Sequence, residues 1–148
     1  FTTAPIIMTY PASPHLAAMI DKCTIDLEKI KQSEEKLFRK YDTILMEGAG
    51  GLMVPITESY LTIDYIKGRN MPLALVTNGQ LGSINHTLLS IEAAINRKIN
   101  IKYIIYNDYF DEDEIIAHET QHYMDNFIKK NLSGTEFLIM NDDKTACK

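Results

Sequence analysis

The stretch YDTILMEGAGG, residues 41–51, joins a β-branched and apolar run to a single carboxylate, Glu47, and then to glycines. Buried parallel strands read as such apolar runs, and open α/β sheets bind ligands beyond the carboxyl ends of their strands. Residues 43–47 are therefore predicted to form a strand that delivers Glu47 to that edge. Glycines let backbone N–H groups approach an anion, and a carboxylate beside phosphate commonly holds Mg²⁺. The alternative is a tight turn with an incidental glutamate.

The segments on either side of this stretch alternate between strand and helix patterns. Residues 5–10 are expected to be a short strand or extended segment, and the prolines at 11 and 14 argue against helix there. Strands alternating with helices imply right-handed βαβ units and a parallel sheet, so the predicted fold class is α/β. Helices are expected over residues 25–41, 61–67, 84–96 and 112–131, and strands over 43–47, 72–77, 101–106 and 136–140.

Length and composition exclude several classes of protein. The 148 residues fit a single α/β domain, 1–148, with a sizeable core. The net charge of −5 argues against a nucleic-acid-binding surface, which would show a basic patch. Cys23 and Cys147 form no spaced pattern, which favours a reduced, cytoplasmic setting. No apolar run approaches the length of a membrane span. Because the first residue is Phe1 and not Met, the sequence need not begin where translation does.

Two further segments follow predicted strands. Gly82-Ser83-Ile84-Asn85-His86-Thr87 opens a predicted helix, and a helix N-terminus offers unpaired N–H donors to an anion. The alternative for Ser83 is a simple N-cap. Asn107 follows the 101–106 strand, and its amide donor and acceptor match the two-sided edge of a purine. The alternative for Asn107 is an ordinary turn residue.

The segment His118-Glu119-Thr120-Gln121-His122 matches the HExxH pattern of zinc hydrolases. Helical phase argues against that function, because a step of about 100° per residue places both histidines nearly opposite Ile116, Tyr123 and Phe127. The histidine pair is therefore expected on the solvent face, and no convincing third ligand follows in the sequence.

Taken together, the segments resemble dethiobiotin synthetase, an ATP-dependent enzyme of biotin synthesis. The resemblance lies in PASPHLAA at 11–18, EGAGGLMVPI at 47–56, PLALVTNGQLGSINHTLLSIEA at 72–93, and the pair Asn107-Asp108. It implies a P-loop NTPase-like fold, a parallel sheet flanked by helices on both faces. It also implies a cytoplasmic homodimer that uses ATP, Mg²⁺ and CO₂ to convert 7,8-diaminononanoate to dethiobiotin, without nucleic acid or membrane.

The resemblance also assigns roles to residues. Glu47 is implied as a Mg²⁺ ligand, and the glycine loop as the lining of the phosphate and carbamate region. The helix start at residues 82–85 is implied to receive the substrate carboxylate across a dimer interface. The implied nucleotide-binding residues are Glu47, Gly48, Ala49, Gly50 and Asn107, and the implied substrate-binding residues are Ser13, Gly51, Gly82, Ser83, Asn85 and Tyr123.

Two departures from the family's pattern leave other functions open. No G-x-x-x-x-G-K-[ST] segment is present, so the chain is expected to be the carboxyl-terminal two-thirds of such a domain, without its first strand, P-loop and P-loop lysine. The family's Gly-x-x-Pro turn after the last strand is replaced by residues 137–142, FLIMND. The alternatives are a related P-loop amidoligase or partition-type ATPase, and a non-catalytic paralogue.

Overall fold

A computed structural model describes residues 3–140 of the chain. These residues form two compact units, and the boundary falls between Tyr65 and Ile66. Cys147, and residues 141–142 of the atypical FLIMND segment, lie outside the described residues. Within residues 3–140, no helix combines the length and the apolar character needed to cross a bilayer.

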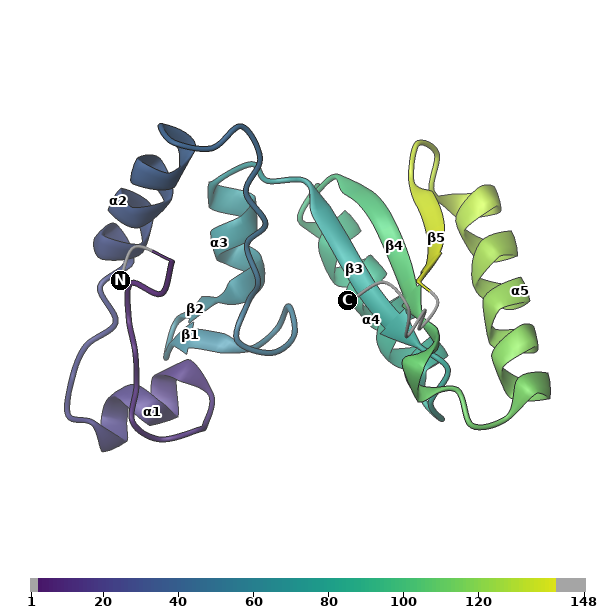
Figure 1. Cartoon of the computed structure of the whole chain (residues 1–148), viewed down its shortest axis with the longest axis horizontal. Helices are drawn as coiled ribbons and strands as arrows, with labels where there is room; N and C mark the ends of the chain where they lie inside the picture. The colour runs from purple at the N-terminus through teal and green to yellow at the C-terminus, as the bar shows by residue number, and fades with distance from the viewer. Residues whose placement is uncertain (1–2, 141–148) are drawn as a thin grey trace, which may run out of the picture. The chain divides into compact units, whose positions relative to one another are not determined.

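The first unit is built mainly from helices and one small hairpin (Figure 1). Strands β1 and β2 pair antiparallel, and α1 packs against β1. Ala17, Ala18, Ile63 and Tyr65 form the buried apolar core of this unit. Its elements are α1 (Pro14–Ile20), α2 (Leu27–Phe38), β1 (Pro55–Thr57), β2 (Tyr60–Leu61) and α3 (Thr62–Gly68), in which the unit boundary falls.

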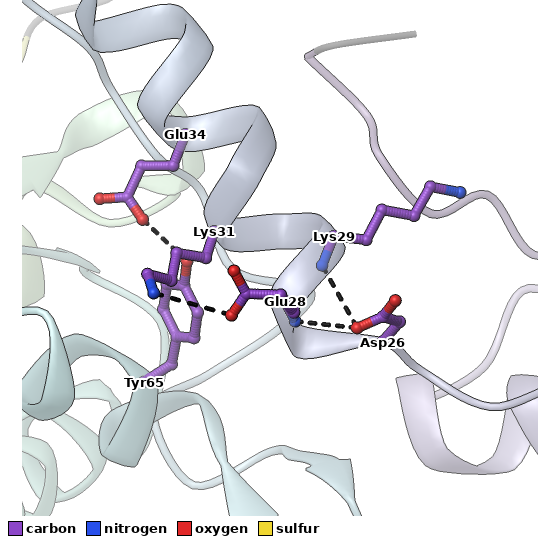
Figure 2. A network of polar contacts seen from close by, with 6 residues as sticks. All are labelled: Asp26, Glu28, Lys29, Lys31, Glu34 and Tyr65. Atoms are coloured by element: carbon purple, nitrogen blue, oxygen red, sulfur yellow. Dashed lines mark hydrogen bonds and ion pairs between the residues drawn. The ribbon is translucent and has the colours of Figure 1, made fainter.

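Helix α2 confirms the predicted helix over 25–41, with shorter ends. Its N-cap is Asp26, whose side chain accepts hydrogen bonds from the backbone N–H groups of Glu28 and Lys29. Farther along, Glu34 is only 3% exposed and accepts a 2.9 Å hydrogen bond from the hydroxyl of Tyr65 (Figure 2). A buried carboxyl group is costly without a hydrogen-bond partner, and this bond supplies one. The same bond links α2 to α3.

Three predictions about the first unit are wrong in whole or in part. Residues 43–47 form no strand, and Leu45 is 94% exposed, because no other described strand supplies the hydrogen-bonded ladder that a strand requires. Of the two forms expected for residues 5–10, the short strand is absent, and these residues have bends at both ends with irregular backbone between them. The prolines at 11 and 14 were expected to exclude helix there, but helix α1 begins at Pro14. Proline is tolerated at a first helical position, because the N–H that it lacks would have no intrahelical partner there.

The second unit is the predicted alternation of strands and helices. Its three strands are all parallel and lie in the order β3-β4-β5. Every element predicted after residue 70 is confirmed, with small shifts at the ends, and the α/β class is confirmed. The elements are β3 (Leu73–Asn78), α4 (Ser83–Asn96), β4 (Ile101–Asn107), the 3₁₀ turn η1 (Asp108–Phe110), α5 (Glu114–Asn131) and β5 (Glu136–Met140).

Both long helices of this unit cover the same face of the sheet. Thr77 and Tyr106 are register partners, so their side chains point to one face. The hydroxyl of Thr77 contacts Thr87 on α4, and that of Tyr106 hydrogen-bonds with Gln121 on α5. Helices were expected on both faces of the sheet, and in this unit α4 and α5 both lie on one face. The core between helices and sheet contains Ile91, Ile104, Tyr106, Met124 and Ile128.

Candidate functional site

The glycine loop of the first unit forms a tight, exposed turn. The N–H of Gly50 donates to the carbonyl of Gly48 at 3.0 Å, and Gly50 has a φ of 93°, a left-handed conformation that favours glycine. A Cβ on Gly48 would lie 3.0 Å from the methyl group of Thr62. The loop is therefore shaped by close backbone packing on α3 as well as by turn geometry.

The other end of this loop is held by backbone hydrogen bonds. The carbonyl of Leu52 accepts from the N–H of Ile63 at 2.9 Å, and that of Val54 accepts from the N–H of Thr62 at 3.0 Å. Glu47 precedes the loop and is exposed, as are Gly48 to Gly51. The prediction that Glu47 ends a buried strand is wrong, but its carboxylate is accessible to a ligand. Among residues 3–140, no group of three or more His, Cys, Asp or Glu side chains could hold a metal ion.

The carboxyl edge of the second unit's sheet gathers several of the predicted residues. Asn107 ends β4 and is the register partner of Asn78, which ends β3. The Oδ1 atom of Asn107 accepts a 3.1 Å hydrogen bond from the N–H of Tyr109 and caps η1. The side-chain oxygen of Asn107 therefore has the role of a turn residue. Its side-chain amide nitrogen is a further hydrogen-bond donor at this edge.

Helix α4 begins at the same edge. Its N-cap is Gly82, with a φ of 91°, and this glycine provides no side-chain cap to the first turn. The interpretation of Ser83 as the N-cap is therefore wrong, because the left-handed backbone that precedes the helix falls on glycine. Asn85 is exposed, and an open hollow of about 310 Å³ lies between β3 and the first turns of α4, with Ser83 in its lining.

Ser13 and Tyr123 complete the predicted set. Ser13 is the N-cap of α1, and it caps through its backbone carbonyl, which accepts from the N–H of Ala17 at 2.9 Å, without a side-chain bond. Tyr123 on α5 is 40% exposed, and its ring stacks on Phe127 with 6.4 Å between centroids. Ser13 and Glu47 to Gly51 thus belong to the first unit, whereas Gly82, Ser83, Asn85, Asn107 and Tyr123 belong to the second.

Helix α5 confirms that the HExxH histidines are on the solvent face. His118 and His122 are exposed, their rings stack at 6.4 Å, and His122 Nε2 lies 2.9 Å from the amide nitrogen of Asn126. Because no described group of three metal-binding side chains includes them, the zinc hydrolase interpretation has no third ligand among residues 3–140. The buried residues of the helix are Ala117, Thr120, Met124 and Ile128. The buried face is therefore shifted by one residue along the helix from the side predicted from Ile116, Tyr123 and Phe127.

One polar cluster at the sheet edge was not predicted. The hydroxyl of Tyr106 donates a 2.8 Å hydrogen bond to Asp111 Oδ1, and both oxygens lie directly over the α-carbon of Gly79. Burial, together with the bond to Asp111, raises the pKa of Tyr106 above its ordinary value. The only sequence signal is Gly79, two residues beyond the predicted strand 72–77, and a simple turn would also show such a glycine.

Comparison with known proteins identifies the family. A family model described as an AAA domain matches residues 1–133. The chain is 48% identical over 139 residues to the ATP-dependent dethiobiotin synthetase BioD 2 of Haemophilus ducreyi, covering 94% of this chain and 66% of the relative. It is 43% identical over 139 residues to BioD 2 of Pasteurella multocida, covering 94% and 65%.

A third relative, the ATP-dependent dethiobiotin synthetase BioD of Chlorobaculum tepidum, is 48% identical over 120 residues, covering 81% of this chain and 50% of the relative. The chain thus spans between half and two thirds of the length of these curated relatives. The resemblance predicted from the motifs is confirmed: the chain belongs to the AAA domain family, and the curated relatives it matches are dethiobiotin synthetases.

Proposed function

We propose that the complete protein is a cytoplasmic, ATP- and Mg²⁺-dependent dethiobiotin synthetase, which closes 7,8-diaminononanoate with CO₂ to give dethiobiotin. The observation that carries the proposal is the 48% identity to the synthetase of Haemophilus ducreyi over 94% of this chain. The aligned length includes the chemistry-bearing segments of both units, because 139 of the 148 residues are matched.

In this proposal Glu47 supplies one carboxylate oxygen to Mg²⁺. The fit rests on one observation, that Glu47 is exposed beside a glycine turn. Mg²⁺ commonly keeps several waters and takes only one or two carboxylates together with substrate phosphates. When bound, the ion would neutralise phosphate charge, and Glu47 would hold it beside Gly48, Ala49 and Gly50.

The nucleotide base is assigned to Asn107. Because the N–H of Tyr109 already occupies Asn107 Oδ1 at 3.1 Å, the amide nitrogen is the group that would donate to adenine. The same local bond fixes the amide plane, so the donor has one orientation at the end of β4. Loss of the η1 turn would therefore weaken base recognition even with Asn107 intact.

The substrate carboxylate is assigned to the start of α4. A helix N-terminus attracts anions through its unpaired N–H groups and its dipole. Glycine as N-cap supplies no side-chain oxygen to the first turn, in which the N–H of Ser83 already donates to the carbonyl of Gln80 at 3.0 Å. Ser83 and Asn85 add polar groups, Tyr123 is assigned to the same carboxylate, and Ser13 and Gly51 are assigned to the diamine end.

The proposal includes a homodimer with a shared site, as the family resemblance implies, in which the diamine end and the carboxylate end of the substrate are bound by different subunits. Mixing an inactive Glu47 variant with an inactive Gly82→Val variant should restore one working site in each mixed dimer. Proven subunit exchange without any recovery of dethiobiotin formation would contradict the shared site. Gly134→Val is the matched control, because Gly134 has a φ of 86° and equally open space but lies between α5 and β5.

The direct test of the function is an assay of the complete protein with 7,8-diaminononanoate, bicarbonate, ATP and Mg²⁺. Dethiobiotin is expected to form in step with ADP, and omission of any one component should stop both. ATP hydrolysis that continues without the diamine, with no dethiobiotin formed, would refute the proposal and favour a partition-type ATPase.

A further inference from the structure

Two buried hydroxyl groups lie side by side beneath the carboxyl edge of the sheet. Thr77 on β3 and Tyr106 on β4 are register partners, and their side chains are 7% and 0% exposed. Both hydroxyls point to the face covered by α4 and α5, because Thr77 contacts Thr87 on α4 and Tyr106 contacts Gln121 on α5. Each one contacts a different segment of the predicted ligand-binding edge.

The hydroxyl of Thr77 connects β3 to the first turn of α4. Thr87 Oγ1 donates a 2.7 Å hydrogen bond to the carbonyl of Ser83, and it lies 2.6 Å from Thr77 Oγ1. A hydroxyl carries one proton, so Thr77 is the donor to Thr87. The resulting chain runs from the strand to the first helical residue, and none of its members is exposed.

The hydroxyl of Tyr106 fixes the loop that leads into α4. Its 2.8 Å bond to Asp111 closes the turn after β4, and a Cβ added to Gly79 would collide with both oxygens. The backbone at Gly79 therefore packs directly onto this bond. A phenol of ordinary pKa already keeps its proton near neutral pH, and burial raises the pKa of Tyr106 further, so the hydroxyl stays a donor.

We propose that Thr77 and Tyr106 are positioning residues, which hold residues 79–83 against the sheet so that the start of α4 keeps one orientation toward an anionic ligand group. The chemical identity of that group, the carboxylate of the substrate, rests on the proposed function. The positioning itself rests on the contacts of Gly79, Ser83 and Thr87.

The variants that test this proposal remove hydroxyl groups and keep shape. Thr77→Val, Tyr106→Phe and the double variant should each keep the fold of the complete protein. The matched control is Tyr103→Phe, because Tyr103 lies on the same strand, three residues earlier and on the opposite face. The first readout is amide hydrogen exchange, which reports local opening without reference to activity.

In the double variant, exchange at residues 79–83 should accelerate on the order of tenfold, while exchange within β3 stays unchanged. The KM for diaminononanoate should rise severalfold with kcat and the KM for ATP near wild-type values, and the control should change neither. Unchanged exchange at residues 79–83 would overturn the positioning role. Uniform acceleration across the second unit would also overturn it, because it would show general destabilisation.

The two proposals fail in different ways. If the wild-type protein forms no dethiobiotin, the proposed function fails, and the exchange measurement still decides whether the two hydroxyls position the loop. If dethiobiotin forms and the KM for diaminononanoate stays at the wild-type value in a double variant with accelerated exchange, the loop does not orient the carboxylate site.

Discussion

Gly79 provides the sharpest test of packing at the sheet edge. In Gly79→Ala the new methyl group would lie closer than 3.0 Å to both Asp111 Oδ1 and the Tyr106 hydroxyl, a separation that real Cβ contacts essentially never show. Both oxygens, or the backbone at residue 79, must therefore move, and such a shift strains or breaks the 2.8 Å hydrogen bond between the oxygens. Overpacking costs about 1–3 kcal/mol and the loss of a hydrogen bond about 1 kcal/mol, so we expect about 2–4 kcal/mol of lost unfolding free energy.

Urea denaturation of the complete protein measures this free energy by linear extrapolation. A double-mutant cycle then tests the cause. Tyr106→Phe removes one of the two colliding oxygens, so it should cost about 1 kcal/mol less in the Gly79→Ala background than in the wild type. The control is Gly51→Ala, because a Cβ there meets nothing within 4 Å and the residue has no positive φ.

Two results would refute this reasoning. A loss of less than about 0.5 kcal/mol of unfolding free energy in Gly79→Ala would equal that of an ordinary surface substitution. It would mean that Tyr106 and Asp111 make room for the methyl group without strain. Additive costs in the double-mutant cycle would mean that the methyl group does not meet the Tyr106 oxygen.

Tyr65→Phe should lower the unfolding free energy by about 1–3 kcal/mol, since it removes a hydrogen-bond donor to the buried carboxyl of Glu34. Urea denaturation measures this loss, and a loss near zero would show that the other contacts of Glu34 are enough to stabilise its buried carboxyl. Replacing His118 and His122 with alanine should leave dethiobiotin formation within about twofold, because both are exposed and distant from the buried face of α5; loss of activity together with loss of a stoichiometric zinc ion would revive the hydrolase interpretation. Glu47→Gln should leave the unfolding free energy within about 0.5 kcal/mol and shift the Mg²⁺ titration of activity to higher concentration, whereas an unchanged titration would remove Glu47 from the metal site.

The sequence by itself determined the second unit. The apolar runs at 72–77, 101–106 and 136–140 and the helical patterns between them carry their own periodicity and turn signals, so local physics places β3 to β5 and the two helices. The family was also readable from local segments, because EGAGG and LGSINHTLL are short contiguous patterns. Such features depend on neighbours along the chain, which a sequence displays directly.

Tertiary structure alone decided the remaining features, because each depends on a partner distant along the chain. Residues 43–47 have strand composition but no described ladder partner, so composition did not produce a strand. The buried face of α5 was chosen by contact with the sheet, which selected Ala117, Thr120, Met124 and Ile128 over the predicted set. The hydroxyls of Thr77 and Tyr106 became neighbours through strand register, a pairing across 29 residues that no local pattern in the sequence records.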